Sequence, residues 1–129
     1  MTRGELTRYI FDTYSVEPDY PFPADNTSAV FRHAAGRKWF ALVMNIPAQK
    51  LGLPSESRID IVNMKCDPVL IGSFRGMRGL FPAYHMSKTN WITAALDGSA
   101  PDETVKTLLD MSYQATAPKI RGKRDNRGE

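Results

Sequence analysis

The chain has 129 residues, 42% of them hydrophobic and 24% charged, which excludes a wholly disordered or fibrous protein and suits one domain with a single core. The formal net charge is only +3. Basic residues outnumber acidic ones four to one in residues 63–91 and five to two in residues 119–129, whereas residues 92–118 hold four acids and one base. The positive charge is therefore concentrated in two places.

The sequence lacks the features of a membrane protein or a metalloprotein. No apolar run approaches the ~20 residues that cross a bilayer, and residues 1–14 hold no apolar stretch of signal-peptide length. We therefore expect a cytoplasmic protein with no membrane partner. The single cysteine, Cys66, cannot form an intramolecular disulfide, and with only two histidines the chain offers few zinc ligands. We expect no metal and, without a cofactor fingerprint, no cofactor.

The N-terminal part is predicted to form a helix followed by an extended connector. Leu6 and Ile10 belong to an apolar set with helical spacing, which predicts an amphipathic helix over residues 3–14 with Thr2 as its N-cap. Residues 15–26 contain three prolines. Because proline removes a backbone donor and restricts the dihedral angles, this segment is expected to be extended and to lie across the core.

Three strands are predicted next. Residues 28–33 and 38–46 flank Gly36, which suits the tight turn of a hairpin. Both alternating sets of the second strand are apolar, which indicates burial on both faces. Residues 58–65 form the third strand, and its apolar pattern changes phase after Ile61. That change predicts a β-bulge near Ile61.

A short helix and a loop follow the third strand. Asp67 is a suitable N-cap and Pro68 suits the first helical position, so we expect a helix over residues 68–75. Gly76 and Gly79 then bracket a flexible loop.

The C-terminal part is predicted to contain a strand, a helix and a tail. Residues 88–96 alternate like a strand, and Ser99 begins a capping-box pattern before a helix over residues 101–116. Residues 118–129 have few apolar side chains and are expected to be a disordered basic tail. Residues 1–117 are then one α+β domain.

The segment 63–91 is the richest in candidate functional residues. Arg75 and Arg78 lie on the glycine loop and Lys88 begins the next predicted strand, so positive charge lies near the aromatic Trp91. This combination suits a partner that carries phosphates, although a solvated charged loop without a ligand has the same pattern. The candidate nucleic-acid-binding residues, including the tail, are Arg75, Arg78, His85, Lys88, Lys119, Arg121, Lys123 and Arg124.

Catalytic interpretations have little support. His85 could act as a general acid, but the sequence shows no nucleophile or acid–base partner in a recognisable pattern around it, and a structural role is favoured. Cys66 follows a lysine, yet a cysteine at a strand end is typically a small buried hydrophobic residue. Trp91 is expected to lie in the core more often than to stack on a base. We predict that the protein is not an enzyme.

Four short motifs, in the order MKCDP, PAYHMSKTNW, LDGSAPDE and SYQAT, resemble the MmcQ/YjbR family of small bacterial proteins over about residues 59–116. The resemblance implies an α+β fold similar to that of frataxin, with an antiparallel sheet packed by the N-terminal and C-terminal helices, and it implies DNA binding. Ala83 and Ser87 differ from the more frequent PGYHMNK. Arg3 and Arg8 accompany the acids of the first helix, which counts against an iron-binding role.

Two function classes stay open. The first is a non-catalytic protein that binds DNA weakly, mainly through phosphates, and therefore less strongly as salt increases. The alternative is a protein–protein interaction or structural module, which predicts an exposed apolar patch and a partner whose binding is insensitive to salt.

Overall fold

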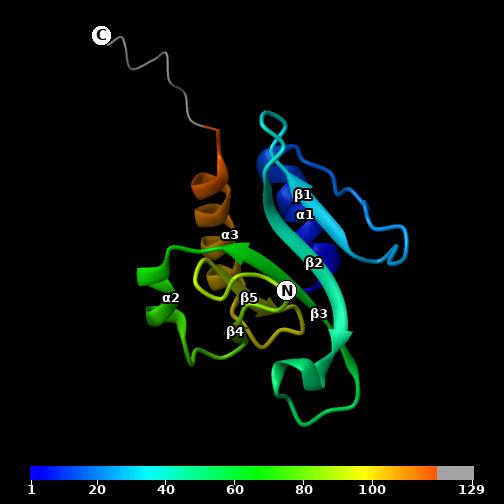
Figure 1. Ribbon diagram of the computed structural model, residues 1–129, viewed down its shortest axis with the longest axis vertical. Helices are drawn as coiled ribbons and strands as arrows, with labels where there is room; N and C mark the ends of the chain where they lie inside the picture. Colours follow the sequence, from blue (N-terminus) through cyan, green and yellow to red (C-terminus); the bar gives the residue numbers. More distant parts are fainter. Residues whose placement is uncertain (119–129) are drawn as a thin grey trace.

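A five-stranded antiparallel sheet with the strand order β1-β2-β3-β5-β4 forms the centre of the protein (Figure 1). The computed structural model describes residues 1–118, so residues 119–129 of the predicted tail lie outside the described residues. The strands are β1 (Ala29–Arg32), β2 (Trp39–Pro47), β3 (Arg58–Lys65), β4 (Leu80–Pro82) and β5 (Trp91–Ala95). The helices are α1 (Arg3–Tyr14), the 3₁₀ helix η1 (Ala48–Leu51), α2 (Pro68–Phe74) and α3 (Asp102–Thr116). The predicted α+β fold with an antiparallel sheet is confirmed.

The N-terminal and C-terminal helices cover one face of the sheet. Leu6 of α1 and Leu108 of α3 are at most 1% exposed and belong to the same core as Val43, Val62 and Ala94 of the sheet. Burying each large aliphatic side chain stabilises the fold by about 1.5–3 kcal/mol. This face therefore holds the main hydrophobic core. Within residues 1–118, no helix is long and apolar enough to cross a membrane.

Helix α1 begins where the sequence predicts. The Thr2 side chain accepts a hydrogen bond from the Glu5 N–H at 3.1 Å, and the Glu5 carboxylate accepts one from the Thr2 N–H at 2.8 Å. This reciprocal pair satisfies two backbone donors that no helical carbonyl can reach. The predicted N-cap at Thr2 is confirmed.

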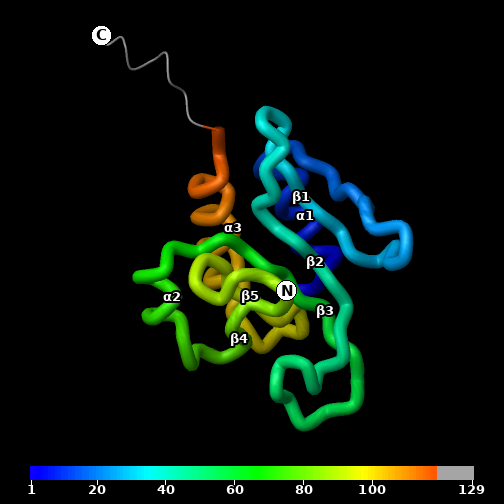
Figure 2. The backbone as a smooth tube through the Cα atoms, viewed as in Figure 1, coloured from blue at the N-terminus to red at the C-terminus, as the bar shows by residue number. Residues whose placement is uncertain are grey.

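The opposite face of the sheet carries a second, smaller core. Ile46, Ile59 and Ile61 are buried there against Leu51 and Leu53 of the connection between β2 and β3. Figure 2 shows that connection as a wide excursion beyond the end of the two strands. Strand β3 is therefore covered on both faces.

The prediction of a β-bulge in β3 is wrong. Strand β3 pairs with β2 in unbroken register from Arg58 to Met64, and the irregularity lies instead between β1 and β2, at Phe31 and Arg32. The apolar pattern of β3 changes phase at Ile61 because both faces are buried, so apolar residues are favoured at odd and even positions alike.

A hydroxyl from α3 completes the ladder where β2 is irregular. The Ser112 Oγ donates to the Phe40 carbonyl at 2.6 Å and accepts from the Lys65 N–H at 2.8 Å, and Ser112 is fully buried. The β2–β3 pairing begins one position further on, at Ala41 and Met64. Ser112 therefore satisfies a donor and an acceptor that the strands do not pair directly.

A buried histidine lies beside this serine. His33 is 3% exposed, and its Nε2 lies 2.9 Å from the Oγ1 of Thr116. The Thr116 hydroxyl donates to the Ser112 carbonyl at 2.7 Å, so it accepts from His33 and leaves the Nε2 as the protonated nitrogen. Burial lowers the pKa of His33 below its usual value, and a hydrogen bond to the Tyr113 backbone opposes that shift only in part.

Stability is expected to fall as the pH decreases below about 6.5, the usual pKa of histidine. The pKa of His33 is lower in the folded protein, so the unfolded chain takes up the proton first and gains free energy from it. Urea unfolding at pH 8 and pH 5 measures the difference. His33→Gln should reduce the pH dependence, and His85→Gln, a change at an exposed histidine, should leave it as it is. An equal dependence in both variants would contradict the assignment.

Three features of the C-terminal half differ from the prediction. Strand β5 starts at Trp91 and not at residue 88, because the Trp91 N–H donates to the Ser87 carbonyl at 3.0 Å in a turn. The capping box expected at Ser99 is wrong: Ser99 bonds to Asp97, and Pro101 is the N-cap of α3 without a side-chain bond. Strand β4 was not predicted, since three residues that include a proline carry no strand pattern.

The two edge strands of the sheet differ in what lies on their outer sides. Beyond β1, the connector bonds to the outer side of Val30: the Asp19 N–H donates to the Val30 carbonyl at 2.9 Å, and the Val30 N–H donates to the Asp19 carbonyl at 2.8 Å. Figure 1 shows this connector along the outer edge of β1. At the other edge, β4 pairs with β5 on one side and has no described strand on its outer side.

Candidate functional site

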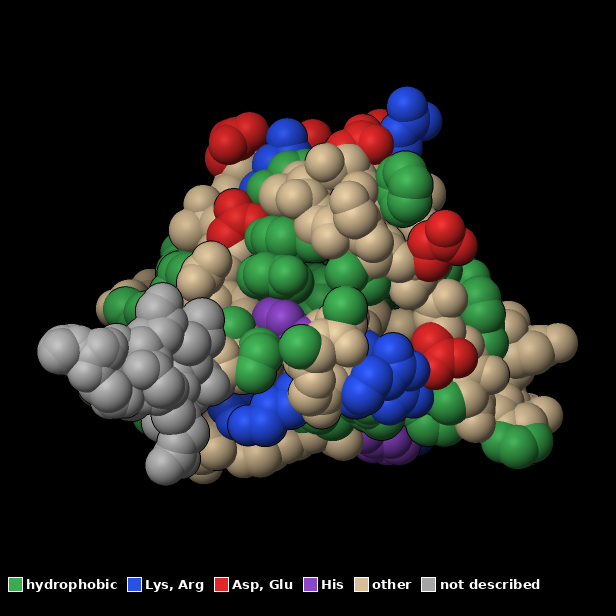
Figure 3. Space-filling view, turned by 90° about the horizontal axis from the view of Figure 1, so that it is seen from above, with side chains coloured by type: hydrophobic (Ala, Val, Ile, Leu, Met, Phe, Trp, Pro, Cys, Tyr) green, Lys and Arg blue, Asp and Glu red, His purple; other side chains and the backbone are tan. Residues whose placement is uncertain are grey.

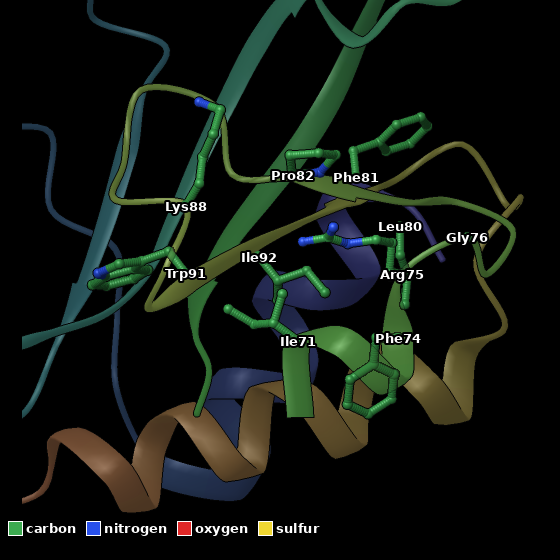
Figure 4. A pocket seen from close by; sticks show the side chains of 10 residues that line it. All are labelled: Ile71, Phe74, Arg75, Gly76, Leu80, Phe81, Pro82, Lys88, Trp91 and Ile92. Carbon is green, nitrogen blue, oxygen red and sulfur yellow. The ribbon is translucent and has the colours of Figure 1, made fainter. Parts of the chain in front are cut away.

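Two cavities lie on either side of the edge strand β4. The first, of about 280 Å³, lies between α2 and the β4–β5 pair (Figure 4). The second, of about 410 Å³, lies between β4 and the connection that follows β2. Phe81, Pro82 and Lys88 line both cavities. We refer to the residues that line these two cavities as the β4 edge.

Helix α2 places Arg75 at the first cavity. Asp67 caps the helix by accepting from the Val69 N–H at 2.8 Å, and Pro68 occupies the first turn, as predicted. The helix ends at Phe74, one residue before the predicted end, and Arg75 already has extended backbone angles. This change of direction turns the Arg75 side chain back over the cavity, where Figure 4 shows its guanidinium beside Pro82.

The loop after α2 is held at both ends. The Met77 N–H donates to the Phe74 carbonyl at 3.1 Å, and the Leu80 N–H donates to the Met77 carbonyl at 3.1 Å. Gly79 has a φ of +80° and is buried against the backbone of Ala100; a Cβ at this position would lie 2.6 Å from the Ala100 Cα. The loop predicted to be flexible is therefore anchored by a glycine that packs against the turn before α3.

A buried polar pair fixes the loop at the second cavity. The Asn63 amide donates to the Tyr84 carbonyl at 3.0 Å, and the Tyr84 N–H donates to the Thr93 hydroxyl at 2.9 Å. Thr93 in turn donates to Asn63, and both side chains are fully buried. His85 follows with a φ of +58°, and its ring stacks on that of Tyr84 with centroids 4.0 Å apart. The two strands β3 and β5 thus position an exposed histidine.

The structure brings together three of the predicted residues and separates a fourth. Arg75 and Lys88 line the first cavity, and Lys88 and His85 line the second. The Lys88 ammonium donates to the Ala83 carbonyl at 2.9 Å and points away from the first cavity (Figure 4). Arg78 lines neither cavity and lies near Asp97. The predicted tail residues Lys119, Arg121, Lys123 and Arg124 lie outside the described residues.

Asp97 shows how Arg78 differs from its neighbours. Burial raises the pKa of Asp97, but hydrogen bonds from Ser99 outweigh that effect and the charge of Arg78 adds to them, so the pKa lies below its usual value. Asp97 is thus an anion near enough for its charge to interact with Arg78, although no ion pair within 4.0 Å joins the two side chains. Arg78 is less available to another anion than Arg75 is.

Sequence reasoning missed two cations near this edge. Lys50 lies in η1 and lines the second cavity together with His85. The Lys65 Nζ lies 5.8 Å from the centroid of the Trp91 ring, on the neighbouring strand. Lys65 alternates with the buried residues of β3, and this pattern could have indicated that its side chain is accessible. No pattern in the polar connection around Lys50 indicates that Lys50 lies at the cavity.

The ion pairs of the described residues lie elsewhere. They join the N-terminal amine to Asp102 and the side chains of α1, β1 and α3 to nearby acids. Within residues 1–118, Arg75, Lys88 and Lys50 have no carboxylate within 4.0 Å. The cations of the β4 edge are therefore not neutralised by the domain.

Other features of the described residues do not form a reactive centre. Cys66 is 2% exposed, and burial, with a contribution from Asp67, raises the pKa of its thiol. The thiol is therefore protonated at neutral pH, and the expectation of a buried cysteine is confirmed. Residues 1–118 contain no group of three or more His, Cys, Asp or Glu side chains that could hold a metal ion.

The space-filling view in Figure 3 shows one face of the molecule. Acidic and basic side chains lie close together along its upper margin, and two clusters of Lys and Arg lie along its lower margin with hydrophobic groups between. This face carries no continuous basic patch.

The fold defines a small α+β domain in which helices cover one face of an antiparallel sheet, and several cations line the two cavities at one sheet edge. A YjbR family model matches residues 12–115. The chain belongs to the YjbR family, as the sequence motifs predicted.

Known relatives agree with this assignment. The YyaQ protein of Bacillus subtilis is 34% identical over 116 residues, which cover 90% of this chain and 98% of that protein. The YjbR protein of Escherichia coli is 39% identical over 54 residues, 41% of this chain and 46% of that protein. A crystal structure from Pseudomonas syringae has a TM-score of 0.88 at 39% identity, covering 91% of this chain and 100% of that one. A Deinococcus radiodurans protein shares the fold, with a TM-score of 0.68 at 24% identity over 98% of this chain and 88% of that one.

Proposed function

We propose that this protein binds nucleic acid weakly, through phosphates, and without catalysing a reaction. The observation that supports it is the set of cations at the β4 edge that no acid of the described domain neutralises. Phosphate contacts are the main source of sequence-independent affinity for nucleic acid.

The location of these cations also favours this function. Residues 63–91 hold four basic side chains and one acidic side chain, and three of the basic ones, Arg75, Arg78 and Lys88, lie outside the helices and strands. Loops can follow a phosphate backbone, but they do not provide the helix that reads bases in the major groove. We therefore expect little sequence preference.

A titration with labelled DNA tests this proposal. Fluorescence anisotropy of duplex and single-stranded DNA is measured at several salt concentrations, for the wild type and for the combined change Lys50→Gln, Arg75→Gln and Lys88→Gln. Each lost phosphate contact should reduce the salt slope on duplex DNA by about 0.9, so three contacts give about 2.7. A chain that ends at Pro118 tests the contribution of the tail.

The control variant changes the net charge equally but elsewhere. Arg8→Gln, Arg32→Gln and Lys106→Gln remove three cations that already pair with Asp12, Asp19 and Glu103. This control should keep most of the salt slope. Absence of binding by the wild type at ~50 mM salt, or equal losses in the two triple variants, would contradict the proposal.

An interaction with another protein is the second candidate. Val69, in the first turn of α2, is 81% exposed, and Met77, on the loop after the helix, is 39% exposed. Exposed apolar side chains mark protein contacts where they form a contiguous patch, so this candidate requires Val69 and Met77 to bind the same partner. A partner held through them would bind with little dependence on salt, which distinguishes this candidate from the first.

A further inference from the structure

The first cavity of the β4 edge has an apolar interior and a single cation directed over it. Its walls come from α2, β4 and the start of β5, and they include the aromatic side chains of Phe74 and Trp91, whereas the Phe81 ring is directed away from the cavity and packs against the second core. The ten lining residues include Arg75 and Lys88 and no acidic residue. In Figure 4 the Arg75 guanidinium extends between Pro82 and Ile92, so the cation lies above apolar walls.

We propose that this cavity binds a small organic anion with one carboxylate and a flat apolar body, the carboxylate pairing with Arg75. The inference does not rest on the proposed function, because it concerns the interior of the cavity and needs no nucleic acid.

The size of the cavity sets the size of the ligand. At about 280 Å³ it lies just below the usual range of about 300–1,000 Å³ for pockets that hold drug-sized molecules. A single ring with a short chain therefore fits, and a larger ligand does not. Aromatic walls favour a flat body through ring contacts.

The charges set the chemistry of the head group. Among residues 1–118, Arg75 has no hydrogen-bond or ion-pair partner for its guanidinium, whereas the Lys88 ammonium is directed to the Ala83 carbonyl at 2.9 Å. One available planar cation matches one carboxylate, which can accept two parallel hydrogen bonds from it. Apolar surroundings strengthen the attraction between the guanidinium and the carboxylate. They disfavour a ligand with several charges, because most of those charges would lose their hydration and gain no oppositely charged partner.

The test uses 3-phenylpropionate as the probe and Trp91 as the reporter. The chain has two tryptophans, so a Trp39→Phe background leaves Trp91 alone. Trp39 contacts Phe22 and Arg32 and does not line the cavity. Titration should quench or shift the Trp91 fluorescence in a saturable way, with half-saturation below ~10 mM.

Two matched probes separate the carboxylate from the apolar body. The alcohol 3-phenyl-1-propanol keeps the ring and lacks the charge, and propionate keeps the charge and lacks the ring. Each should bind roughly ten-fold or more weakly than 3-phenylpropionate, because hydrogen bonds to a charged group and ring burial both contribute. An alcohol that binds as tightly as the acid would overturn the proposal.

Variants locate the binding. Arg75→Gln should weaken 3-phenylpropionate roughly ten-fold or more and leave the alcohol unchanged, whereas Arg78→Gln, outside the cavity, should change neither. Ile71→Trp should fill the cavity and abolish binding of both; circular dichroism checks that it folds. If it does not fold, the Arg75 comparison still decides. Equal effects of the Arg75 and Arg78 changes, or no saturation in the wild type, would overturn the proposal.

Discussion

Gly79→Ala is expected to destabilise the protein by about 2–5 kcal/mol, a large part of the about 5–15 kcal/mol that holds a domain folded. Two costs add. Gly79 has a φ of +80°, which an alanine adopts only at a cost of about 1–2 kcal/mol. The added Cβ would also overlap the backbone of Ala100, and backbone atoms cannot move aside as a side chain can. Urea unfolding of the variant and the wild type measures the loss.

Gly76→Ala provides the matched control. Gly76 has a φ of +84°, close to that of Gly79, but a Cβ there would meet no atom within 4 Å. This variant carries the backbone cost alone and should lose about 1–2 kcal/mol. Equal losses at the two glycines would mean that the close approach to Ala100 does not matter.

Ser112→Ala is expected to cost about 2–5 kcal/mol. The change leaves the Phe40 carbonyl and the Lys65 N–H without the partner that Ser112 provides, and each unsatisfied buried group costs about 1–3 kcal/mol. Besides chemical denaturation, amide hydrogen exchange reports the effect directly, because the Lys65 amide should exchange faster.

The control for Ser112→Ala lies on the same helix. Thr107 is exposed on α3, and Thr107→Ala should change stability by no more than about 0.5–1 kcal/mol, since alanine favours the helix and no contact is lost. A Ser112 variant as stable as this control would show that the hydroxyl does not complete the ladder.

The elements with strong local signals were predictable. Periodic apolar residues and a capping pair define α1, and Asp67 with Pro68 defines the start of α2. Other features depend on distant parts of the chain. Strand β4 exists because β5 pairs with it, and the irregularity of β2 is stabilised by Ser112, 72 residues after Phe40. A three-residue strand and a buried serine carry no pattern that local reasoning can detect.

The sequence identified some of the cations of the candidate site, but it did not predict how they are arranged around the cavities. The motif around His85 and Lys88 indicated the segment that lines the two cavities of the β4 edge, because charge and aromatic residues gather there in the sequence. The cavity could not be predicted, since its walls come from three elements whose relative positions the Asn63–Thr93 pair and Gly79 determine. Arg75 and Arg78 look equivalent in the sequence, and only the fold separates them.

The two edge strands of the sheet, β1 and β4, are each protected from pairing with a strand of another molecule, but in different ways. An exposed edge strand offers unpaired backbone groups to a strand of another molecule, which is a common route to aggregation. Here Asp19 already bonds to the outer side of β1, and β4 is only three residues long and ends in Pro82, which has no N–H to donate. Neither edge is a good template for intermolecular β-sheet growth, so the protein should stay soluble at concentrations where a sheet with a long open edge would form fibres.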